Sequence, residues 1–172
     1  MAFLNEVSYR HYIRNPRKNL FDFNTPDGNY WIGFLLADGH INVDSEGSLE
    51  VYQYIGNKRN IDHFLEYVKD SSTEVIGTFN MSKTGDIVYI PKNPDIDKLV
   101  KTFDWKNNMK KCPNIDKIIK YFNNLNFNNS LAFICGFIDG DGSIKDKGNC
   151  VIEINIKTSF WNSRLFYTRR CT

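Results

Sequence analysis

Residues 31–39 read WIGFLLADG, and residues 134–142 read ICGFIDGDG. Each stretch is an apolar run that reaches an Asp-Gly pair, at Asp38 in the first and, 103 positions further on, at Asp141 in the second. In both places the residues that follow alternate in the manner of a β-strand. A repeat of that length, with the same passage from helix to strand, predicts two similar half-domains.

Small residues recur inside both apolar runs. Gly33 and Ala37 lie four positions apart in the first run, as do Gly136 and Gly140 in the second. Residues at that spacing share one helix face, and small side chains there let two helix backbones come unusually close. If the two helices pack on each other, the aspartates at their C-terminal ends lie side by side.

Two neighbouring carboxylates at such a position need a cation. They repel each other, and both lie at the negative end of a helix dipole. Mg²⁺ prefers oxygen ligands and usually keeps water or substrate phosphate in its shell. Because metal ions held between carboxylates and a phosphodiester can activate water and stabilise the leaving oxygen, Asp38 and Asp141 predict phosphodiester hydrolysis with Mg²⁺ or Mn²⁺.

Each motif alone has a simpler interpretation. Asp-Gly is a common hairpin-turn dipeptide, so a single apolar helix that ends in Asp-Gly is most often a core helix followed by a turn. Two such helices, with glycine at the same offset and strands after each, are much less expected by chance. The repetition therefore favours a functional interpretation.

The two stretches resemble the two copies of the motif of the LAGLIDADG homing endonuclease family, and the resemblance covers about residues 25–157. The second copy is the closer match. Leu36 stands where the family often has an acid, so the catalytic acids that carry over are Asp38 and Asp141. The metal site expected from the resemblance also includes the neighbours of these acids, namely Ala37, Gly39, Gly140 and Gly142.

The resemblance implies an α+β fold of two pseudo-symmetric αββαββα half-domains, packed through the motif helices. It also implies antiparallel saddle sheets in the major groove of double-stranded DNA, and cleavage of a long recognition site, as in intron homing. The expected division is a basic N-terminal arm at 1–24, a first half-domain at 25–112, a linker with a helix at 113–129, and a second half-domain at 130–172.

The local patterns predict the elements of these segments. In the arm, Arg10, Arg14, Arg17 and Lys18 are expected to be solvated more often than to track a phosphate backbone. Thr25 is expected to cap the first motif helix, with Pro26 at its first position, and Ser130 is expected to cap the second. The other predicted elements are strands at 40–43 and 48–55, a helix at 58–69, a second hairpin of strands 75–81 and 87–90, a helix at 95–103, a helix around 115–122, and strands at 143–145 and 151–157.

Polar strand residues are the candidates for base contacts, because side chains of a β-ribbon can read the major groove. The expected DNA-binding residues are Glu50, Tyr52, Tyr54, Lys83, Glu153, Asn155 and Lys157. By resemblance, Lys111 is the basic residue near the scissile phosphates. Gln53 resembles, more loosely, the polar residue that helps to order active-site water.

The second half-domain is shorter than the family pattern requires. Only 31 residues follow Asp141, which leaves room for one hairpin at most, and residues 159–172 show no helical period. We therefore expect a truncated second half, and a monomer unless a partner chain supplies the missing part. Activity of this chain is left open at this point, and the alternatives are an RNA-binding intron maturase and a non-catalytic DNA-binding fragment.

Composition sets few limits. The formal net charge is +2, which does not exclude DNA binding, because the placement of Lys and Arg decides it. The four cysteines lie far apart without a metal-ligand spacing, which predicts reduced thiols in a reducing compartment. The sequence does not identify that compartment, and a bacterial or phage-infected cytoplasm and an organelle matrix both fit. The longest apolar stretches are far shorter than the roughly 20 residues of a membrane helix, so no membrane partner is expected.

Overall fold

The structure is a computed structural model that describes residues 9–42, 48–53, 58–79, 85–105, 113–146, 150–155 and 164–168. Side chains are described within residues 9–37, 60–79, 85–105 and 113–140. The fold is α+β, and it divides into two compact units, one of Met1–Leu20 with Gly39–Asp97 and one of Phe21–Asp38 with Lys98–Thr172. No helix in the described ranges has the length and apolar character that crossing a bilayer demands.

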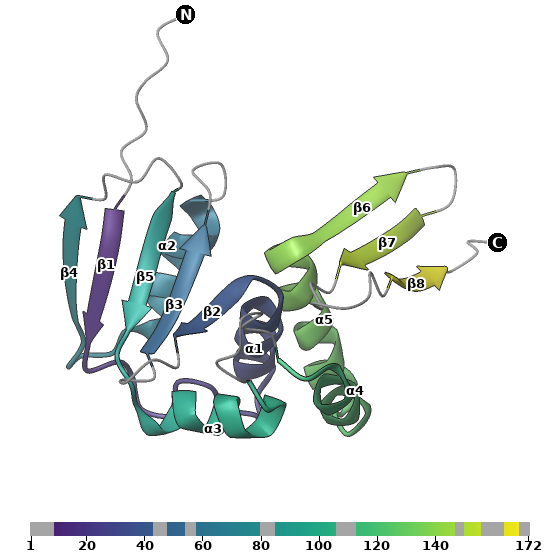
Figure 1. Cartoon of the computed structure of the whole chain (residues 1–172), viewed down its shortest axis with the longest axis horizontal. Helices are drawn as coiled ribbons and strands as arrows, with labels where there is room; N and C mark the ends of the chain where they lie inside the picture. Colours follow the sequence, from purple (N-terminus) through teal and green to yellow (C-terminus); the bar gives the residue numbers. More distant parts are fainter. Residues whose placement is uncertain are drawn as a thin grey trace, which may run out of the picture. The chain divides into compact units, whose positions relative to one another are not determined.

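The first unit is built on a five-stranded sheet, with the strand order β2-β3-β5-β1-β4. The strands are β1 (Tyr9–Arg14), β2 (Gly39–Asn42), β3 (Ser48–Gln53), β4 (Glu74–Phe79) and β5 (Asp86–Ile90). They lie at the positions that the alternating patterns predict for strands, with the exception of β1. One helix of this unit, α2 (Lys58–Val68), lies behind the sheet in the view of Figure 1.

The place of β1 corrects two sequence-based predictions. All six residues of β1 pair antiparallel with β4, from Tyr9 opposite Phe79 to Arg14 opposite Glu74. The other side of β1 pairs parallel with β5. The strands β4 and β5 are therefore not hydrogen-bonded to each other, and the predicted second hairpin is wrong. The interpretation of residues 9–14 as part of a solvated basic arm is wrong as well.

Helix α2 confirms the predicted amphipathic helix at 58–69 and covers one face of the sheet. Its apolar stripe, Ile61, Phe64, Leu65 and Val68, is buried. On the face that α2 covers, the sheet buries Ile13 of β1 with Val88 and Ile90 of β5, which occupy alternate positions as the period of a strand requires. Ile87, on the opposite face of β5, is buried as well. In the described part of this unit, α2 covers one face of the sheet and no helix covers the other.

The second unit is formed mainly by α1 (Pro26–Asp38), α4 (Ile115–Asn123) and α5 (Phe127–Asp141), and α3 (Pro94–Phe103) leads the chain into it. The predicted cap of α1 is confirmed, because the Gly28 amide donates to Thr25 Oγ1 at 3.2 Å. The predicted cap of α5 is wrong. That helix begins one turn earlier, where the Asn129 amide donates to Asn126 Oδ1 at 3.0 Å, and Ser130 lies inside the helix.

A three-stranded sheet follows α5, with the order β6-β7-β8. Its strands are β6 (Gly142–Asp146), β7 (Cys150–Asn155) and β8 (Arg164–Thr168), all antiparallel to their neighbours. The first two are the predicted hairpin. The third strand corrects the expectation of one hairpin at most, because β8 lies within residues 159–172, beyond that hairpin.

Aromatic side chains hold α4 against α5 in this unit. The ring centroid of Phe133 in α5 lies 5.9 Å from that of Tyr121 and 5.7 Å from that of Phe122. The rings of Tyr121 and Phe103 pack edge to face, with centroids 5.1 Å apart. Contacts of this kind add about 0.5–1.5 kcal/mol each to the burial of the rings. The cluster fixes the helix that carries the second motif to the helix that precedes it.

The position of β1 gives a test by mutation. Ile13 is 1% exposed, so Ile13→Ala is expected to lower the free energy of unfolding by about 2–5 kcal/mol, measured by urea unfolding. The neighbouring exposed variant Arg14→Gln should change it by less than about 0.5 kcal/mol. A solvated arm would give a small value for both, and that outcome would contradict the central place of β1.

Candidate active site

The two motif helices, α1 and α5, cross at glycines. A Cβ atom added to Gly33 would lie 2.2 Å from the backbone oxygen of Phe133, and one added to Gly136 would lie 1.8 Å from the backbone oxygen of Tyr30. Real Cβ atoms do not approach backbone so closely. The helices therefore come nearer than pairs that side chains hold apart, whose axes lie about 8–10 Å from each other, and the predicted packing of the motif helices is confirmed.

The contacts at this crossing are reciprocal. Gly33 faces the backbone of Phe133 and Phe137, and Gly136 faces the backbone of Tyr30 and Phe34. Gly136 lies 103 positions after Gly33, and the residues it faces lie 103 positions before those that Gly33 faces. The same offset relates the two motif aspartates.

The two aspartates end their helices at the same distance from the crossing. Asp38 is the last residue of α1 and Asp141 the last residue of α5, each five residues after its crossing glycine. Five residues advance a helix by about 7.5 Å. Each aspartate therefore lies at the negative end of its own helix dipole. The side chains of the two aspartates lie outside the described part of the structure.

The residues beside these acids have the backbone setting that the sequence predicts. Gly39 opens β2 directly after α1, and Gly142 opens β6 directly after α5. Ala37 and Gly140, one position before each aspartate, are half-buried. Each helix thus passes into a strand without an intervening loop, so the acid stands at the joint between two regular elements.

One carboxylate of the second motif is already occupied. Tyr30 of α1 donates its phenol proton to Asp139 Oδ2 of α5 at 2.7 Å. Burial, and then the hydrogen bond and charge of Asp139, raise the pKa of Tyr30. The positions related to this pair by the 103-residue offset are Phe133 and Leu36, both buried and apolar. Leu36 thus occupies the place where the second motif has a paired acid.

A second polar contact fixes the start of α1. Asn29 is fully buried and donates to the backbone oxygens of Phe23 and Thr25 at 3.0 and 2.8 Å, while its Oδ1 accepts from the Tyr121 hydroxyl at 2.6 Å. The Asn29 amide nitrogen therefore has two acceptors and its oxygen has one donor, so neither atom is buried without a partner. Sequence analysis missed Asn29, Tyr30 and Tyr121, because their pairing depends on residues about 90–110 positions away in the sequence.

The remaining predicted site residues are placed only in part. Glu50, Tyr52 and Gln53 lie in β3, opposite Tyr89, Ile87 and Asp86 of β5, and Glu153 and Asn155 lie in β7. Their backbones are described and their side chains are not. Tyr54, Lys83, Lys111 and Lys157 lie outside the described residues.

Among the described side chains, no three His, Cys, Asp or Glu residues gather at a spacing that could hold a metal ion. That search does not include Asp38 or Asp141. No protein-family model and no curated protein matches this chain.

The glycine crossing predicts a large effect of a single methyl group. Gly33→Ala and Gly136→Ala are each expected to lower the free energy of unfolding by about 1–3 kcal/mol, because the new Cβ pushes the backbones apart. Gly77→Ala is the control, since its Cβ would meet its nearest neighbour at 4.0 Å. Urea unfolding measures all three, and equal effects at Gly33 and Gly77 would contradict the close crossing.

The Tyr30–Asp139 bond predicts a dependence on alkaline pH. The unfolded chain gives up the Tyr30 proton above about pH 10, whereas the folded protein keeps it, because the pKa of Tyr30 is raised. The stability that this bond contributes is present below that pH and is lost as pH rises further. Tyr30→Phe should therefore lose less stability between neutral and alkaline pH than the wild type does.

Urea unfolding at the two pH values measures this difference, with Tyr9→Phe as the control at an exposed tyrosine. An alkaline loss that is the same in wild type and Tyr30→Phe would show that the hydrogen bond to Asp139 does not hold the proton.

Proposed function

We propose that this chain is a metal-dependent DNA endonuclease of the LAGLIDADG type, with Asp38 and Asp141 as its catalytic acids. The observation that carries the proposal is the reciprocal crossing of α1 and α5 at Gly33 and Gly136. An accidental pair of core helices has no reason to repeat the same contacts at the offset that separates the two Asp-Gly motifs.

The crossing supports a pseudo-two-fold arrangement of two half-domains, at residues 25–112 and 130–172. In that arrangement α1 and α5 are equivalent elements, each followed at once by a strand. The clustering of α1 with the second motif rather than with its own sheet follows from the closeness of this helix pair. The half-domains share their central helices instead of each forming a separate core.

A divalent cation fits the chemistry at the ends of these helices. Two carboxylate residues end two helices at their negative poles, and within the described part of α1 and α5 the last turns carry no basic residue to compensate. Oxygen ligands and an unfavourable accumulation of negative charge favour Mg²⁺ or Mn²⁺. Asp38 and Asp141 would hold it, with the backbone around Ala37, Gly39, Gly140 and Gly142.

The bound cation would lower the pKa of a water molecule and neutralise charge on the phosphodiester. The residues of the protein would position the cation and the DNA. The glycine crossing sets how near the two acids stand, and the Tyr30–Asp139 bond keeps the third motif carboxylate engaged with α1. In this proposal Lys111 stabilises charge at the scissile phosphate, and Gln53 orients water.

Double-stranded DNA is the proposed substrate, read by the strands that follow each motif helix. The register of β3 aligns Glu50 and Tyr52 with Tyr89 and Ile87 of β5, so these two candidate readers share one face of the sheet. Tyr54 and Lys83 in the first half, and Glu153, Asn155 and Lys157 in the second, complete the proposed set of DNA contacts.

The three aspartates of the motifs allow a matched test. Asp38→Asn and Asp141→Asn are each expected to reduce cleavage of a DNA target library in Mg²⁺ by at least about a hundredfold, because the amide cannot replace the charge that holds the cation. Asp139→Asn is the control, since its carboxylate is bonded to Tyr30, and it should retain cleavage within a few-fold. Gel analysis of cut products measures the rates.

The outcome that contradicts the mechanism is cleavage that Asp141→Asn leaves intact. Equal loss in Asp139→Asn and Asp141→Asn, with unchanged folding, would assign the effect to the charge of the whole motif instead of to the helix-terminal acids.

A further inference from the structure

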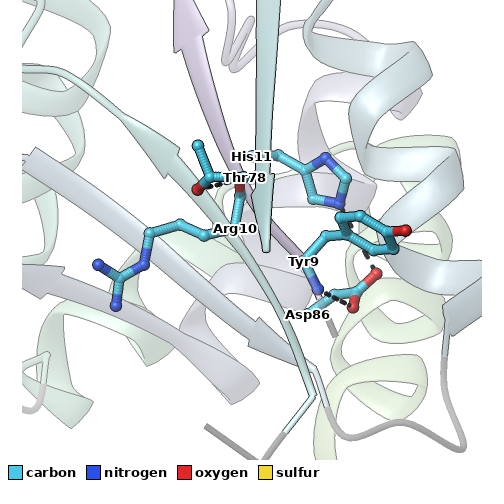
Figure 2. Close-up of polar contacts among 5 residues, drawn as sticks. All are labelled: Tyr9, Arg10, His11, Thr78 and Asp86. Atoms are coloured by element: carbon cyan, nitrogen blue, oxygen red, sulfur yellow. Dashed lines mark hydrogen bonds and ion pairs between the residues drawn. The ribbon is translucent and has the colours of Figure 1, made fainter. Parts of the chain in front are cut away.

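Strand β1 presents two different faces. Tyr9, His11 and Ile13 alternate with Arg10, Tyr12 and Arg14. Figure 2 shows that Arg10 and His11 point to opposite sides of the strand, with Asp86 on the side of His11. Along a strand, every second residue shares a face. The arginines therefore share one face of the sheet, which we call the arginine face.

The other face of β1 holds the strand in place. Asp86 Oδ1 accepts from the Tyr9 amide at 2.8 Å, and its Oδ2 lies 3.6 Å from His11 Nε2 (Figure 2). Ile13 on this face is buried together with Val88 of β5. These contacts, and backbone pairing on both sides, fix β1 firmly, so the direction in which its arginines project is set by the sheet.

On β1 and β4 the arginine face carries exposed side chains, whereas Ile87 of β5 on the same face is buried. Arg10, Arg14 and Thr78 are exposed, and Thr78 stands opposite Arg10 in the register. The described charged side chains that β1, β4 and β5 present on this face are Arg10, Arg14 and Glu74, and the register adds Glu50 of β3 to the same face. Tyr12 and Tyr89 pack between the strands with ring centroids 5.5 Å apart, which stiffens the centre of the face.

The same face continues into the strand that the proposed function assigns to DNA. In the register, Tyr12 pairs with Tyr89 and Tyr89 with Glu50, and Arg10 pairs with Ile87 and Ile87 with Tyr52. Cross-strand partners share a face. Residues 10, 12, 50 and 52 therefore belong to one continuous face across β3, β5 and β1.

We propose that β1 extends the DNA-binding surface, with Arg10 and Arg14 as contacts to the phosphate backbone. This inference rests on the proposed function and adds to it a surface that precedes the first motif in the chain. Arg10 and Arg14 lie four residues apart, which along a strand is about 13 Å, close to the roughly 12 Å width of the DNA major groove. A ribbon in the groove can thus reach both of its phosphate walls.

The ion pair between Arg14 and Glu74 does not prevent the contact. Arg14 lies 3.6 Å from Glu74, and both side chains are more than half exposed. Such pairs contribute little to stability, so Arg14 can exchange the carboxylate for a phosphate. Arg10 donates to the Tyr12 hydroxyl at 3.3 Å in an exposed contact, so its side chain stays at the surface of this face.

The test measures the binding of a mixed-sequence DNA duplex by the full chain as a function of salt, without divalent metal. Each phosphate contact contributes about 0.9 to the slope of log K against log salt. Arg10→Gln with Arg14→Gln is therefore expected to reduce the slope by about 2 and to weaken binding at low salt at least tenfold. Lys117→Gln with Lys120→Gln, at exposed positions of α4, is the matched control and should leave the slope unchanged.

Circular dichroism melting verifies that the double variant folds. A salt slope that the arginine substitutions leave unchanged overturns this inference, while the cleavage test of Asp141→Asn still decides the proposed function. A reduced slope without cleavage in Mg²⁺ or Mn²⁺ supports the surface and overturns the nuclease. Tighter binding of structured RNA through the same arginines overturns the assignment to DNA, and no salt-dependent binding at all overturns both proposals.

Discussion

Gly33 and Gly136 leave no room for a side chain between the motif helices, and the rest of the candidate site depends on this contact. Each glycine lies against the backbone of the opposite helix, so the distance between the helices is set by main-chain atoms instead of by flexible side chains. Protein interiors are close-packed and do not deform gradually. A position fixed by backbone contact therefore carries over, with little freedom, to the last residues of both helices five positions later.

The pair is nearly symmetric in its backbone and asymmetric in its polar groups. Tyr30 and Asp139 form a hydrogen bond between the helices, whereas the equivalent Phe133 and Leu36 are buried and apolar. A single polar bond across an otherwise apolar contact favours one register, because sliding the helices would leave the phenol and the carboxylate without each other. We infer that the first motif, which has Leu36 in place of this acid, stabilises the helix pair through burial of the leucine side chain.

The sequence predicts the motif helices, α2, α3 and α4 well, because their signals are local. A stripe such as Ile61, Phe64 and Val68 needs only its own helix to be recognised. The cap of α5 was misassigned for a local reason, since Asn126 and Ser130 are both good capping residues. The insertion of β1 was missed for a different reason. Its partners are sixty or more residues away, and the four basic residues near the N-terminus concealed the alternation of Arg10, Tyr12 and Arg14 with His11 and Ile13.

The alternation in β1 also explains how one short strand can be both structural and charged. The pleat separates Ile13, which the core requires, from Arg10 and Arg14, which water or a polyanion can accept. A helix of the same composition would spread these side chains around its circumference and bury part of the charge. Because β1 pairs on both sides, the strand cannot rotate about its axis, and Arg10 and Arg14 stay on the same face of the sheet. A partner on this face of the sheet therefore meets Arg10 and Arg14 at a fixed place, between β5 and β4.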